Sequence, residues 1–70
     1  MTNLNTEQYV VEVKLHSRWT EAYSRFLSDN DVPALISMTC DRTTFRMSAE
    51  DEIKIRELWN PQDYAQYVWN

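Results

Sequence analysis

Glycine is absent from all 70 residues of the chain, although average usage would give about five in a domain of this length. Loops that cradle phosphates and turns that bind dinucleotides need glycine, because the backbone there takes positive φ and approaches the ligand closely. The sequence therefore excludes ATP, GTP and NAD(P) sites of the usual kinds, and we expect no cofactor.

Cysteine and histidine are scarce, with Cys40 and His16 as the single residue of each type. One cysteine cannot form an internal disulfide, and the two residues together cannot supply the ligands of a structural zinc site. We expect Cys40 to lie in the core and His16 to be exposed at the end of a strand. A nucleophilic Cys–His pair is therefore not predicted, nor is a metal site.

Long apolar runs and basic segments are missing as well. No stretch approaches the length of a membrane span, and residues 1–8 lack the basic and apolar regions of a signal peptide. These absences predict a cytoplasmic protein without a membrane partner. The net charge is −4, from 7 basic and 11 acidic residues, and no segment is strongly basic, so we expect no direct contact with nucleic acid.

Apolar and aromatic residues, in contrast, are plentiful, at 43% and 13% of the chain, as is typical of a folded domain. A chain of this length forms a single domain, residues 1–70, near the lower size limit for one hydrophobic core. Residues 1–6 are polar, and we expect them to be loosely ordered.

The apolar period changes along the first half of the chain. Residues 7–16 alternate, which predicts a half-buried strand with one apolar side, made of Tyr9, Val11, Val13 and Leu15. Residues 17–31 switch to a helical period with Ser17 as the N-cap, and the apolar face consists of Trp19, Tyr23, Phe26 and Leu27. The polar run before Pro33 ends this helix.

Residues 34–48 have the pattern of a β-hairpin. If Cys40 lies opposite Thr43, antiparallel pairing places Met38 opposite Phe45 and Ile36 opposite Met47, with all the apolar side chains on one face. The turn at residues 41–42 lacks the Gly or Asn that a tight turn prefers. A four-residue loop in the same register is an alternative.

Residues 48–60 predict a second helix. Ser48 precedes Asp51 by three residues, which is a capping-box pattern. The expected core stripe consists of Ile55, Leu58 and Trp59, widened by Ile53.

Residues 60–70 can form either a helix or a strand. Asn60 is a good N-cap, Pro61 is favoured in the first helical turn, and Asp63 lies near the positive end of the helix dipole. We therefore predict a short C-terminal helix and an α+β fold with the order β-α-β-β-α, in which two helices pack on an antiparallel sheet. A fourth strand, which would complete a ferredoxin-like βαββαβ fold, is the alternative.

Candidate binding residues fall into three groups. Aromatic residues near a chain end are hard to bury in so small a domain, and exposed Tyr and Trp are typical of protein interfaces. Arg42 at the hairpin tip could anchor an interface, and the acidic residues at the second helix start fit a capping role but could also contact a basic partner. The candidates are therefore Tyr64, Tyr67, Trp69, Arg42, Glu50, Asp51 and Glu52.

The function expected from these residues is protein binding without catalysis. In size and composition, the chain resembles the small accessory proteins of bacteriophages, including anti-CRISPR and other host-takeover inhibitors. This resemblance implies an inhibitor that occludes a larger protein in the host cytoplasm. A homodimeric regulatory or small-ligand-binding domain is the alternative, and a small enzyme depending on Cys40 or His16 ranks last.

Overall fold

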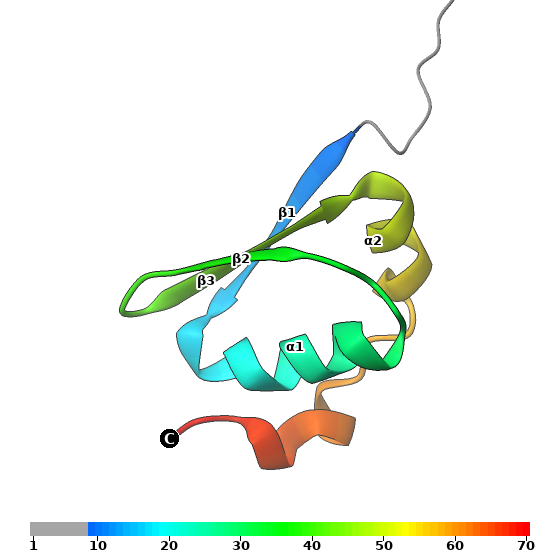
Figure 1. Ribbon diagram of the computed structural model, residues 1–70. Coiled ribbons are helices and arrows are strands. Elements are labelled where there is room, and N and C mark those ends of the chain that lie inside the picture. The colour runs from blue at the N-terminus through cyan, green and yellow to red at the C-terminus, as the bar shows by residue number, and fades with distance from the viewer. Residues whose placement is uncertain (1–8) are drawn as a thin grey trace, which may run out of the picture.

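The structure, a computed structural model, describes residues 9–70, so the expectation for residues 1–6 lies outside the described part (Figure 1). It confirms an α+β fold. The strands are β1 (Val10–His16), β2 (Leu35–Met38) and β3 (Arg42–Ser48). The α-helices are α1 (Thr20–Asp29) and α2 (Ala49–Arg56), and two 3-10 helices complete the chain, η2 (Ser17–Trp19) and η3 (Pro61–Tyr67).

The sheet has three antiparallel strands in the order β1-β3-β2. In Figure 1, α1 lies between this sheet and η3, while α2 packs beside one end of the sheet. The C-terminal segment is thus the predicted short helix, of the 3-10 type, and the alternative of a fourth strand is wrong. The reason is local: Asn60 accepts a hydrogen bond from the Gln62 N–H at 3.2 Å, and Pro61 occupies the first turn.

The core forms where alternate strand residues meet the apolar face of α1. Val11, Val13 and Leu15 of β1 point toward the helices, as period two requires. The buried cluster takes its members from α1, the loop after α1, β3 and α2, and consists of Tyr23, Phe26, Leu27, Val32, Phe45, Met47 and Ile55. Tyr9 is 51% exposed, so its expected place in the core is wrong.

The hairpin register differs from the predicted one by two residues. Met38 pairs with Thr43 and Ile36 with Phe45, which keeps the apolar residues on one face because a shift of two preserves the alternation. Cys40 is exposed in the turn rather than buried, and this prediction is wrong. Ser17 holds the turn in place, since its N–H donates to the Asp41 carbonyl at 3.2 Å and its hydroxyl to the Cys40 carbonyl at 3.0 Å.

Because Ser17 bonds to the hairpin turn, it does not serve as the predicted N-cap of the first helix. The side chain of His16, not Ser17, caps η2, because its Nδ1 accepts the Arg18 N–H at 3.1 Å. His16 is exposed at the end of β1, as expected.

The first helix ends without glycine at the position that usually carries it. Asp31 has φ 57°, in the left-handed region that short polar side chains tolerate best after glycine. The Val32 N–H donates to the Leu27 carbonyl at 2.9 Å and the Asp31 N–H to the Ser28 carbonyl at 3.1 Å, which is the Schellman pattern. Val32 is buried as a result, and the chain turns back into β2.

The second helix begins as predicted and ends earlier. The Ser48 hydroxyl accepts the Asp51 N–H at 3.1 Å, which confirms the cap. Because α2 ends at Arg56, Leu58 lies beyond it and is 55% exposed, and Ile53 is 59% exposed. The predicted stripe is therefore wrong for these two residues, while Ile55 is fully buried and Trp59 packs against the core.

Candidate partner-binding surfaces

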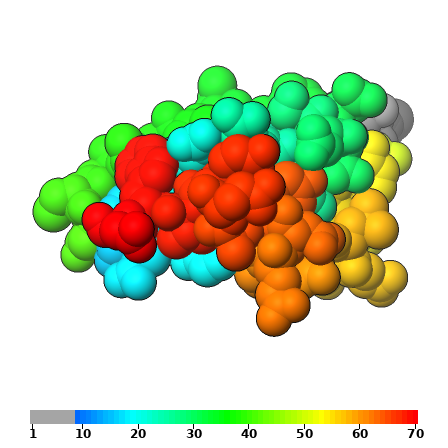
Figure 2. Space-filling model, turned by 90° about the horizontal axis from the view of Figure 1, so that it is seen from below, coloured from blue at the N-terminus to red at the C-terminus, as the bar shows by residue number. Residues whose placement is uncertain are grey.

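The outer side of α1 carries charged residues at four-residue intervals, Glu21, Arg25 and Asp29. Residues four apart share one helix face, so these side chains form a row along α1. Each of them contacts one ring of the C-terminal segment: Tyr64 meets Asp29, Tyr67 meets Arg25, and Trp69 meets Glu21. Residues 60–70, orange and red in Figure 2, spread across the middle of this side of the molecule.

Tyr64 is the most firmly held of the three rings. Its hydroxyl donates to Asp29 Oδ2 at 2.6 Å, and its ring stacks on Trp59 with centroids 5.9 Å apart. The hydrogen bond to the Asp29 carboxylate, with partial desolvation, raises the pKa of Tyr64 to about 12. The Tyr64 ring is partly buried and packs against the core cluster.

Tyr67 and Trp69 lie farther along the row. The Arg25 guanidinium sits 4.2 Å from the centre of the Tyr67 ring, a cation–π contact. Trp69 donates its indole N–H to Glu21 Oε1 at 3.2 Å and its backbone N–H to the Arg18 carbonyl at 2.9 Å. The indole N–H and the neighbouring guanidinium lower the pKa of Glu21, so these contacts strengthen as that carboxyl loses its proton.

These contacts give all three rings a role within the chain. Trp69 remains 43% exposed, beside an open hollow of about 500 Å³. His16, Ser17 and Arg18 form one wall of the hollow, and residues 68–70 form the other. That these rings contact a partner stays a prediction, with Trp69 as the ring most open to one.

Raising the pH should release Tyr64. Its pKa is higher in the folded chain than the ordinary value near 10, so the folded state holds this proton more tightly. The stabilisation is complete below about pH 10 and is lost as the pH rises toward 12. A spectrophotometric titration of tyrosinate in the wild type and in Tyr64→Phe isolates this group as the difference, since burial also raises the pKa of Tyr23.

The control for this titration is Asp29→Asn, which should move the Tyr64 step back toward the ordinary range by removing the carboxylate. A difference step between the wild type and Tyr64→Phe centred near pH 10, the ordinary value for a tyrosine, would contradict the assignment.

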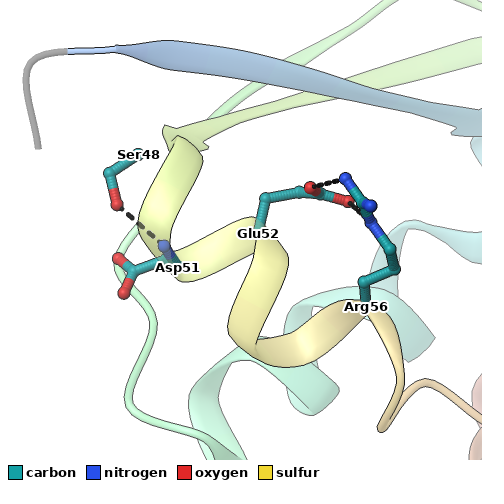
Figure 3. A network of polar contacts seen from close by, with 4 residues as sticks. All are labelled: Ser48, Asp51, Glu52 and Arg56. Atoms are coloured by element: carbon teal, nitrogen blue, oxygen red, sulfur yellow. Dashed lines mark hydrogen bonds and ion pairs between the residues drawn. The ribbon is translucent and has the colours of Figure 1, made fainter. Parts of the chain in front are cut away.

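The acidic residues of α2 serve the helix itself (Figure 3). The Asp51 backbone is held by the Ser48 cap, and Glu52 forms an ion pair with Arg56 at 2.6 Å. Glu50 is exposed in the first turn, where the helix dipole favours a negative charge. Whether these carboxylates also contact a partner stays a prediction.

The predicted site residues do not converge on one surface. In Figure 1, the start of α2 and the turn of the β2–β3 hairpin lie at opposite ends of the molecule, and η3 lies on the far side of α1 from the sheet. Arg42 is exposed at the start of β3, paired with His16 of β1. A single partner covering all three groups would have to wrap around the domain.

The edge strand β2 is the surface that the sequence prediction missed. All four of its residues are exposed, including Leu35 at 71%, Ile36 at 50% and Met38 at 53%. Residues 32–40 contain no charge, whereas the other edge strand, β1, carries Glu12, Lys14 and His16. Native sheets usually protect their edges with charged side chains, and of the two edges only β1 has this protection.

The backbone of β2 is also open to a further strand. The Thr39 N–H donates to the Arg42 carbonyl at 2.8 Å, so the backbone N–H and C=O groups of Thr39 point toward β3. Because antiparallel ladders alternate, Ser37 and Leu35 do the same, while the N–H and C=O groups of Ile36 and Met38 point away from β3. Within residues 9–70 these groups have no backbone partner, so they form an open edge.

A groove runs beside this edge on the helix side of the sheet. It is an open hollow of about 250 Å³ between α1 and β2. Four of its six lining residues are apolar, and the lining consists of Ser24, Leu27, Ser28, Val32, Ala34 and Ile36. A strand added to β2 would place alternate side chains over this groove.

Other kinds of site find little support in residues 9–70. Over this range, no group of three or more His, Cys, Asp or Glu side chains is arranged to hold a metal ion, and none of the helices has the length and apolar character needed to cross a membrane. Comparisons of the chain with protein-family models, with curated proteins and with solved structures returned no match.

Proposed function

We propose that this chain is a non-catalytic protein-binding module, and that it takes up an extended segment of a larger protein along β2. The observation that carries the proposal is the contrast between the two sheet edges. β1 is charged, whereas β2 exposes Leu35, Ile36 and Met38 beside an unpaired backbone. Adding a strand to such an edge is a common mode of peptide recognition, in which the main chain supplies affinity and side-chain pockets supply specificity.

The biological role that fits this module is inhibition by occlusion. A small domain that adds a strand to a partner covers part of the partner's surface without chemistry of its own. The size and composition of the chain support a phage-type accessory inhibitor acting in the host cytoplasm. Trp69 and the hollow beside it offer a second contact for the same partner.

A homodimer is the second candidate, and the same edge favours it. Two copies of β2 could pair with each other, since this strand carries no charge that would repel its mate. A regulatory or ligand-binding dimer would then have a continuous sheet across two chains.

Replacing Ile36 with lysine should abolish partner binding and leave the fold intact. Ile36 is half-exposed, so the substitution costs little stability, but it puts a charge at the edge and over the apolar groove. With the chain as bait in host lysate, we expect the partner retained by the wild type to fall at least about tenfold, equal to about 1.4 kcal/mol.

The matched control is Ile53→Lys, which changes an isoleucine of similar exposure, 59%, on α2. It should retain the partner at the wild-type level. Equal retention by Ile36→Lys and Ile53→Lys would exclude β2 as the binding surface. Sedimentation of the purified chain separates the homodimer, whose mass Ile36→Lys would halve.

A further inference from the structure

The open face of the sheet, turned away from the helices, collects basic residues from separate segments. Phe45 is buried on the helix side of the sheet, and side chains alternate between the two faces along each strand. Lys14, Arg42 and Arg46 therefore project to the open face. Glu12 is the acidic residue among the three strands and projects to the same face. The face therefore has a net charge of +2, on a chain whose net charge is −4.

The basic residues on this face are incompletely neutralised. Glu12 is shared between Lys14 at 3.8 Å and Arg46 at 3.7 Å, and exposed pairs of this length contribute little. Arg42 forms no ion pair with any residue from 9 to 70. All three cations can thus attract a negative group that approaches the open face.

Arg46 lies next to the apolar part of the β2 edge. It is the cross-strand neighbour of Leu35, and the two residues line a shallow hollow of about 240 Å³ together with Val10, Met47 and Ser48. A glutamate on a strand added to β2 could lay its methylene groups on Leu35 and direct its carboxylate toward Arg46. The added strand would lie two strand spacings, about 10 Å, from β3. An arginine and a glutamate side chain that extend toward each other can span this distance, which is about the Debye length at 0.1 M salt.

We propose that the segment bound along β2 is an extended acidic one, in which acidic and apolar residues alternate. This proposal rests on the function proposed above and adds the chemical class of the bound segment. The acidic side chains would face Arg42 and Arg46 on the open side of the sheet, and the apolar side chains would fill the groove between α1 and β2. Period two places these two sets on opposite sides of one strand.

Two other occupants fit the charges less well. A second copy paired through β2 would continue the sheet and bring two open faces of net charge +2 side by side. A single-stranded nucleic acid would meet the cations, but none of the three strands carries an aromatic ring on the open face for its bases to stack on. It would also leave the β2 edge without a paired strand.

Two synthetic peptides of about seven residues, a common strand length, test the proposal. One alternates valine with glutamate and the other valine with lysine, and both are N-methylated on alternate amides so that they do not pair with themselves. Each is titrated at low salt into the isotope-labelled full-length chain while backbone amide shifts are followed. We expect the glutamate peptide to shift the Ile36 and Met38 amides and to bind at least about tenfold more tightly than the lysine peptide.

Charge variants connect this preference to the open face. The double variant Arg42→Ser, Arg46→Ser should bring the two affinities within about twofold, whereas Lys54→Ser, which removes an exposed cation of α2, should preserve the preference. Added salt should weaken the preference as well.

Each remaining outcome overturns the proposal in a distinguishable way. Equal binding of both peptides at β2 would reject the acidic partner and leave the edge as a protein-binding surface. No shift at β2 with either peptide would reject the edge itself, and with it the proposed function. A dimer that buries the β2 amides, or an oligothymidylate that binds more tightly than the glutamate peptide, would reject the acidic strand in favour of that occupant.

Discussion

Phe45→Ala should remove most of the chain's stability at 25 °C. Phe45 is fully buried in the central strand, opposite Val13 on one side and Ile36 on the other, and its ring lies 4.9 Å from that of Tyr23. Truncating a buried phenylalanine costs about 3–5 kcal/mol, and a domain of this size has a total stability of only about 5 kcal/mol. Circular dichroism during a urea titration would measure the loss.

The conservative replacement Phe45→Leu and the surface replacement Leu35→Ala provide the scale for this result. Filling most of the site with leucine should cost about 1.5 kcal/mol or less, and Leu35, 71% exposed in β2, should tolerate alanine with little change. A Phe45→Ala chain as stable as Leu35→Ala would show that β3 is not the centre of the core.

Trp59→Ala should be the second most damaging change and should release the C-terminal segment. Trp59 is a half-buried hub whose ring lies 4.9 Å from both Tyr23 and Phe26 and 5.9 Å from Tyr64. We expect a loss of about 3 kcal/mol, toward the lower end for a tryptophan because the ring is only partly buried. Without this ring Tyr64 loses its stacking partner, and residues 61–70 should become accessible to protease.

Two controls separate loss of the hub from loss of the terminal contacts. Trp59→Phe keeps an aromatic ring and should lose less than half as much stability as Trp59→Ala. Trp69→Phe removes the indole N–H that donates to Glu21 and should leave the core unchanged. If proteolysis after residue 60 were equally slow in Trp59→Ala and the wild type, the segment would be held by its contacts with α1 alone.

Local signals account for the parts of the fold that were predicted. The cap of α2 depends on Ser48 and the amide three residues on, and the start of η3 depends on Asn60 and Pro61. The alternation in β1 likewise survives in the folded chain. In each case the pattern and the interaction that it reports lie within a few residues of each other.

The parts that could not be predicted depend on contacts between distant segments. Nothing in Leu35 or Ile36 shows that β2 is an outer strand, because the order β1-β3-β2 is set by β1 pairing with β3 across the intervening helix. The register was wrong because Ser17 positions the hairpin turn from outside the hairpin.

The candidate site was harder to predict for the same reason. The terminal rings find their contacts on α1, and the spacing of Glu21, Arg25 and Asp29 shows a charged row without showing what lies on it. The basic open face of the sheet could not be predicted from any single segment, because Lys14 lies in β1 whereas Arg42 and Arg46 lie in β3.

The strand order also has a consequence for synthesis on the ribosome. Of the three strands in residues 9–70, β1 is made first, and its neighbour among them is β3. The backbone of β1 therefore lacks this partner while α1 and β2 are made. The hairpin of β2 and β3 is local in sequence and can close quickly, which makes it the template on which β1 docks last.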